Sequence, residues 1–162
     1  MRTLLIIPAA VALSAALVSF SGPASAARLF FEGDMVRGST QSGATGPTCV
    51  LSSQFMRREH VVFRIRVLDD TGAPADDKML KSLVVELSNG KSLPMRYGGH
   101  PHNEPVDNFW TTSWPIPDDY PTGTLSYKVV ATSMDGSTQE WTPFNVSLSQ
   151  LTVIPGDVSF TK

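Results

Sequence analysis

The sequence has almost no cysteine. Cys49 is the only one in 162 residues, so no intrachain disulfide can form. A single cysteine also excludes a CxxCH haem attachment, a cysteine-rich zinc site and a CxxC redox pair. We expect Cys49 to be a small buried hydrophobe at the start of a strand. The alternative is a thiol that pairs with another chain or binds a soft metal.

The chain also lacks a large excess of positive or negative charge, and it lacks the common catalytic motifs. The chain has 13 Lys and Arg against 15 Asp and Glu, a net charge of −2. That balance lacks the basic face that nucleic acids require and the polybasic patch that binds anionic membranes. The sequence contains no GxSxG, HExxH, P-loop or GxGxxG motif. We therefore expect a protein that is not an enzyme and carries no cofactor, although a catalytic carboxylate pair has no sequence motif that would reveal it.

The N-terminus is typical of a bacterial export signal. Arg2 supplies the positive charge, Leu4 to Phe20 is apolar, and Ala24-Ser25-Ala26 is a small-x-small cleavage site. No stop-transfer pattern follows, so we expect no membrane span after cleavage. These residues predict a mature protein that begins at Ala27 and works in the periplasm or as a secreted protein.

Short strands separated by turn signals make up the rest of the chain. Alternation is clearest in Val61–Leu68 and Thr124–Thr132, where every second residue is apolar. The inward faces are expected to carry Phe63, Ile65 and Val67 from the first segment and Leu125, Tyr127, Val129 and Ala131 from the second. Other predicted strands are Arg28–Val36, Thr48–Phe55, Leu83–Leu87, Ser92–Tyr97, Asn108–Ile116, Thr138–Val146 and Ser149–Ile154.

Turn residues fix how these strands connect. Asn89-Gly90 is a strong hairpin signal, and Pro94 in the following arm indicates an edge strand or a bulge. Only Asp76–Ser82 has the composition of a helical turn, with Asp76 or Asp77 as its N-cap. Without helices to cross between parallel strands, the fold is predicted to be an all-β antiparallel sandwich of about seven to nine strands.

The stretch from Val61 to Ile154 resembles an immunoglobulin-like or fibronectin type III-like domain of exported bacterial proteins. The resemblance is carried by the Asp-x-Gly turn ending at Gly72, the tryptophan strand Phe109–Trp114 and the run IPDDYPTGTLSYKVVA at Ile116–Ala131. It implies that Tyr127 is a tyrosine corner whose hydroxyl bonds nearby backbone. Both core cysteines of antibody domains are missing, so packing alone would hold the sandwich. The resemblance implies a fold and no active site.

The domain organisation follows from these segments. Residues 1–26 are the predicted signal, 27–47 an N-terminal segment with a flexible Gly/Ser/Thr-rich loop, 48–155 the immunoglobulin-like sandwich and 156–162 a C-terminal tail.

One loop has the donors for a metal. His100 and His102 are spaced so that both imidazoles point to one side of an extended chain, and Met95 lies close in sequence. His60 from another strand would complete a set that suits copper or zinc. The other interpretation is a solvated polar loop, with His60 a turn residue at a strand entrance.

Aromatic residues gather in the second half of the sequence. Trp110 and Trp114 share a strand face, which is typical of a core. Together with Tyr120 they are also candidates for an exposed patch that binds a partner or a carbohydrate.

These observations predict a non-enzymatic periplasmic accessory protein that docks to another exported protein, such as a redox or transport component. Docking is expected through a sheet face, the end loops or an edge strand, either Leu29–Val36 or the Pro94 strand. The alternative function is copper or zinc binding by the His100/His102 loop. A weaker one is a small hydrolase or carbohydrate-recognition domain.

Overall fold

The computed structural model of the chain describes residues 28–38, 49–100 and 106–156. In these ranges it contains eleven strands and no helix. The strands are β1 (Phe30–Arg37), β2 (Gln54–Met56), β3 (His60–Leu68), β4 (Leu80–Leu87), β5 (Ser92–Pro94), β6 (Arg96–His100), β7 (Asp107–Pro115), β8 (Gly123–Leu125), β9 (Tyr127–Ser133), β10 (Thr138–Trp141) and β11 (Leu151–Ile154). Nothing in this part of the chain is a helix long and apolar enough to cross a membrane. The predicted signal at residues 1–26 lies outside it.

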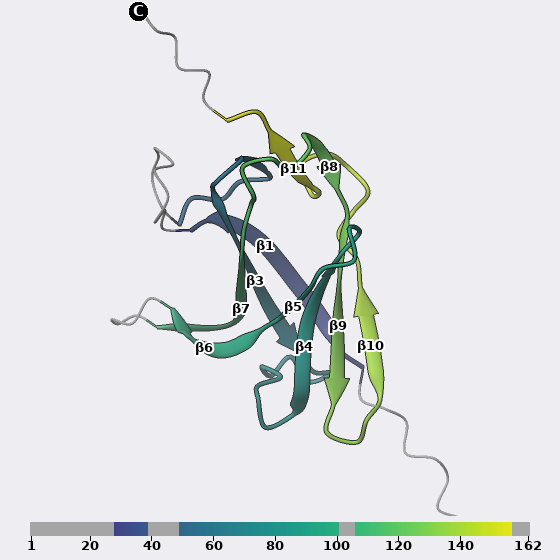
Figure 1. Cartoon of the computed structure of the whole chain (residues 1–162). Coiled ribbons are helices and arrows are strands. Elements are labelled where there is room, and N and C mark those ends of the chain that lie inside the picture. The colour runs from purple at the N-terminus through teal and green to yellow at the C-terminus, as the bar shows by residue number, and fades with distance from the viewer. Residues whose placement is uncertain (1–27, 39–48, 101–105, 157–162) are drawn as a thin grey trace, which may run out of the picture.

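Two antiparallel four-stranded sheets form the body of the molecule (Figure 1). One has the strand order β1-β3-β7-β6 and the other β10-β9-β4-β5. A small third sheet, β2-β11-β8, lies at one end, and its β2–β11 pair is the one parallel pairing among the described strands. The predicted all-β sandwich without helix is confirmed. Strands outnumber the expected seven to nine because the runs Ser92–Tyr97 and Thr124–Thr132 each break once.

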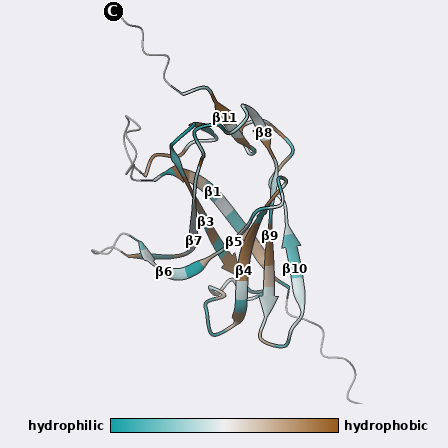
Figure 2. Ribbon diagram, viewed as in Figure 1, coloured by the Kyte–Doolittle hydropathy of each residue, from teal (hydrophilic) through white to brown (hydrophobic). Residues whose placement is uncertain are grey.

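The core lies between the two large sheets. Phe63 and Ile65 from β3 and Val129 and Ala131 from β9 are fully buried. Hydropathy colouring shows the apolar residues concentrated on β3, β4 and β9 (Figure 2). Burying each large apolar side chain contributes about 1.5–3 kcal/mol, and in a chain without a disulfide this burial is the main stabilising term. The period-2 pattern of the sequence therefore identified the inward faces correctly.

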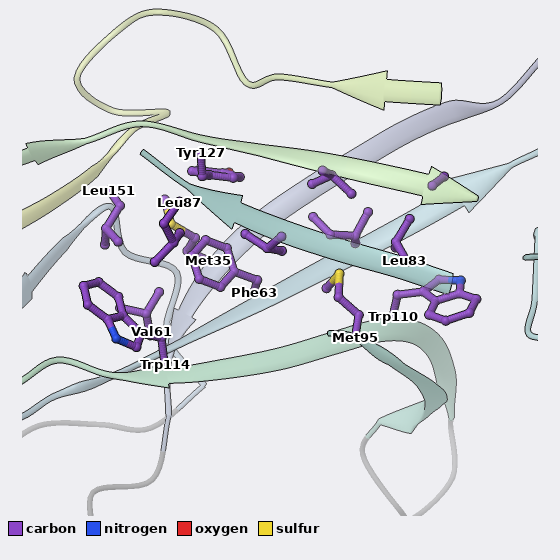
Figure 3. Packing of buried hydrophobic residues seen from close by; sticks show 14 of the residues in the cluster. Met35, Val61, Phe63, Leu83, Leu87, Met95, Trp110, Trp114, Tyr127 and Leu151 are labelled. Atoms are coloured by element: carbon purple, nitrogen blue, oxygen red, sulfur yellow. The ribbon is translucent and has the colours of Figure 1, made fainter. Parts of the chain in front are cut away.

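One arm of the Asn89-Gly90 hairpin belongs to both sheets. β5 pairs with β4, and after a single residue, Met95, the chain continues as β6 and pairs with β7 of the other sheet. The Met95 side chain is buried among the core residues (Figure 3). Pro94 is tolerated because β5 is the edge strand of its sheet, so no neighbour needs the missing N–H.

Local turn chemistry is as the sequence predicts at two connections. Gly90 has a φ of 84°, a conformation that glycine adopts without strain, and its N–H donates to the carbonyl of Leu87. At Asp76 the carboxylate accepts the N–H groups of Lys78 and Met79, which makes it the N-cap of a single turn. That turn ends as β4 begins at Leu80.

A buried carboxylate closes the turn between β2 and β3. The Glu59 side chain is 2% exposed. It accepts a hydrogen bond of 2.7 Å from the backbone N–H of Met56, and the Arg37 side chain of β1 lies 3.1 Å from its other oxygen. Arg58, beside it, has a φ of 72°. The carboxylate thus holds β1, β2 and β3 together at one end of the sandwich.

Candidate functional site

Paired charges cover the outer face of the β1-β3-β7-β6 sheet. Arg64 donates two hydrogen bonds of 2.8 Å to the two oxygens of Asp34. These bonds are the main reason that the pKa of Arg64 is raised above its ordinary value. Arg64 and Arg66 both lie over the Phe109 ring, at 5.4 and 5.1 Å from its centroid. This face is therefore a fixed polar layer without a large excess of either charge.

A pocket of about 280 Å³ opens on this layer, with Cys49 and His100 among its lining residues. The Sγ atom of Cys49 lies 3.9 Å from Nε2 of His100. The remaining lining residues are Val36, Arg37, Gly38, Val62, Arg64 and Thr111. Two residues that are 51 positions apart in the sequence therefore meet as a thiol and an imidazole.

The backbone around Cys49 explains why the thiol is exposed. Cys49 has a φ of 58°, and its N–H donates a 2.7 Å hydrogen bond to the carbonyl of Arg37. Cys49 is exposed and lies outside the regular strands, so the expectation of a buried hydrophobe at a strand start is wrong. The first regular strand after it is β2, which begins at Gln54 and not at Thr48.

Of the predicted metal ligands that the structure describes, His100 alone lines this pocket. Met95 is 7% exposed and points into the core, whereas His100 is exposed and lines the pocket. His60 begins β3 and does not line the pocket. His102 lies outside the described residues. Among residues 28–38, 49–100 and 106–156, no group of three His, Cys, Asp or Glu side chains is placed to hold a metal ion.

The candidate aromatic patch is mostly core. Trp110 and Trp114 are 4% and 1% exposed. The Trp110 indole donates a 2.9 Å hydrogen bond to the carbonyl of Ala75, and Trp114 packs edge-on against Tyr120 with ring centroids 5.0 Å apart. Neither indole presents a face to solvent. These contacts favour the interpretation of the two tryptophans as core residues and leave Tyr120 half-buried at the edge of that core.

Tyr127 is also a core residue. Its ring packs against Phe63 and Trp141, with centroids 5.1 and 6.4 Å apart. Burial, with a smaller effect from the negative charge of Asp34, raises the pKa of Tyr127 to about 12. The tyrosine-corner hydrogen bond remains a prediction.

An apolar groove that the sequence analysis missed runs beside β1. It has a volume of about 400 Å³, and its apolar lining includes Met35, Leu51, Trp141, Phe144 and Leu148, while Asp34, Ser52, Ser53 and Ser149 add polar groups to the wall. Phe144 is 81% exposed, Leu148 79% and Leu51 64%. Solitary exposed apolar residues are ordinary, but three around one groove are typical of an interaction site.

The groove exists because the predicted strand Thr138–Val146 stops early. β10 ends at Trp141, and Pro143, which has no N–H to donate, follows two residues later. The apolar residues after it alternate with polar ones as in a strand, yet they stand in solvent. In the sequence, Pro143 is the feature that indicates the end of strand pairing before these alternating residues.

No protein-family model matches the sequence, and no curated protein matches it significantly. Among solved structures, the chain is similar to the crystal structure of a DUF4426 family protein from Pseudomonas aeruginosa PAO1. The TM-score is 0.40 at 14% sequence identity, over 80% of this chain and 93% of that chain.

Proposed function

We propose that the chain is an exported, non-enzymatic accessory protein that docks to another exported protein along β1. The single observation that supports this most strongly is the apolar groove beside that strand, with Leu51, Phe144 and Leu148 largely exposed around it. The predicted export signal at residues 1–26 is the reason to place the protein and its partner in the periplasm or outside the cell. A redox or transport component is the kind of partner we expect.

The scaffold we propose is an immunoglobulin-like domain. The strand order β1-β3-β7-β6 corresponds to A-B-E-D of that fold, and β10-β9-β4 corresponds to G-F-C. In this comparison β1 is the outer strand A, which leaves one of its edges open for a partner. The lack of a disulfide is a departure from antibody domains.

The occupant we propose is an extended segment of the partner that adds to the sheet as a strand. The chain already pairs with the end of β1, because the Ser52 N–H donates to the carbonyl of Met35 and the Arg37 N–H donates to that of Val50. Before Met35 no described strand forms a ladder with this edge, although at its far end the Leu29 N–H donates to the Gln139 side chain of β10 and Trp141 stacks on Phe31. A strand continuing along this line supplies backbone partners to β1, and apolar side chains at every second position rest in the groove.

The test places a photo-crosslinking amino acid at position 148 in the full chain, produced in its native host. We expect one adduct with an exported protein. The double variant Phe144→Ser and Leu148→Ser should abolish binding of that protein in purified form while the circular dichroism spectrum stays unchanged. Met134→Ser is the matched control, because Met134 is 57% exposed and lies outside the groove.

Two outcomes contradict the proposal. If the groove variant binds the purified partner as well as the Met134→Ser control does, the groove is not the docking surface. If the adduct is with a second copy of this chain, the edge of β1 mediates self-association and not docking to a different protein.

A further inference from the structure

We propose that Cys49 and His100 bind one Cu(I) ion in the pocket on the outer sheet face. This inference is independent of docking, since no residue lines both the pocket and the groove. Binding would replace the thiol proton of Cys49 with the metal, so that one proton is released to solvent for each Cu(I) bound. No change in oxidation state is involved.

The distance between the two donor atoms suits a single bridging ion. Sγ of Cys49 and Nε2 of His100 are 3.9 Å apart. First-row metals such as zinc bind sulfur at about 2.3 Å and imidazole nitrogen at about 2.0–2.1 Å, so one ion spans donor atoms up to about 4.3 Å apart. A linear two-coordinate site with these bond lengths needs the two donor atoms about 0.4 Å farther apart, a shift that rotation of the two exposed side chains supplies.

The number of donors favours Cu(I) over zinc. Thiolate binds both Cu(I) and zinc, and imidazole suits both metals, so the preference comes from the number of donors. A closed zinc site takes about four protein ligands, whereas the described residues offer no group of three. Cu(I) is stable with two ligands.

The neighbouring charges favour the same ion. Arg37 and Arg64 line the pocket, and their carboxylate partners, Glu59 and Asp34, are held in ion pairs and do not line the pocket. No carboxylate in the pocket wall is available to offset the second charge of a divalent ion. A Cu(I)–thiolate unit carries no net charge, so it enters this environment with less electrostatic cost than Zn²⁺.

The test is an anaerobic titration of the full, reduced protein with Cu(I) in competition with a chromogenic chelator. We expect one Cu(I) per chain, and at least a tenfold loss of affinity in both Cys49→Ser and His100→Ala. His60→Ala is the matched control, because it removes an imidazole that lies outside the pocket, and it should bind as the wild type does. X-ray absorption of the copper-loaded protein should show one sulfur and one nitrogen scatterer.

The variants should fold normally because Cys49 and His100 are both exposed, and circular dichroism checks this directly. Unchanged Cu(I) affinity in Cys49→Ser overturns the site. Retained affinity in His100→Ala together with loss in His102→Ala overturns the assignment of His100. Tighter binding of Zn²⁺ than of Cu(I) overturns the choice of metal. None of these results bears on docking at the groove, which has its own variants.

Discussion

Replacing Glu59 with alanine should destabilise the sandwich by about 2–4 kcal/mol. Its 2.7 Å hydrogen bond from the Met56 N–H is to a charged, buried acceptor, and such bonds contribute about 1.5–3 kcal/mol. The ion pair with Arg37 adds at most about 1 kcal/mol, because the Arg37 side chain is 28% exposed and regains water when the carboxylate is lost. Glu59→Gln keeps an acceptor for Met56 and should cost only about 1 kcal/mol.

Urea unfolding followed by tryptophan fluorescence measures this directly. With a urea dependence of about 2 kcal/mol per molar, the middle of the range for small proteins, the midpoint of Glu59→Ala should fall by about 1–2 M. The control is Glu140→Ala, since Glu140 is 56% exposed in its pair with Lys128 and its loss should cost less than about 1 kcal/mol. A Glu59→Ala midpoint equal to that of the control would refute the reasoning that Glu59 holds three strands together.

Two further predictions concern the core. Gly33→Ala should lower the free energy of unfolding by about 1–3 kcal/mol, because the new Cβ would lie 2.8 Å from both Ile65 Cδ1 and Trp141 Cη2. Gly98→Ala is the control: it has open space around it and should be close to neutral in the same urea assay. The pKa of Tyr127 is raised to about 12, so the neutral phenol is favoured in the folded state and stability should fall as the pH rises from about 10 to 12. Tyr127→Phe should flatten this fall, and an unchanged loss of stability between pH 9 and 12 in that variant would contradict the assignment.

The fold was largely predictable because its signals are local. Alternation in β3 and β9 identified the buried face, and Asn89-Gly90 identified a hairpin, since both depend on residues close in sequence. The switch of sheets at Met95 was not predictable. Pro94 marked an irregularity there, but pairing of one arm with two different sheets depends on contacts with β4 and β7, which are distant in sequence.

The candidate site was predicted only in part. His100 was singled out from its spacing to His102, but Cys49 lies 51 residues earlier and no local pattern connects the two. Met95 was grouped with His100 because they are close in the sequence. In the sheet, however, the face to which a side chain points alternates, and Met95 points into the core. The groove beside β1 was missed because the sequence predicts one strand over Thr138–Val146, whereas β10 ends at Trp141.

The arm that passes from β5 to β6 couples the opening of one sheet to the opening of the other. β5 hydrogen-bonds to β4 of one sheet and β6 to β7 of the other, with a single residue between them. Movement of one sheet away from the other therefore breaks backbone hydrogen bonds at β4 or at β7. We therefore expect hydrogen exchange in β4 and β7 to proceed at one common opening rate, as a single cooperative unit would.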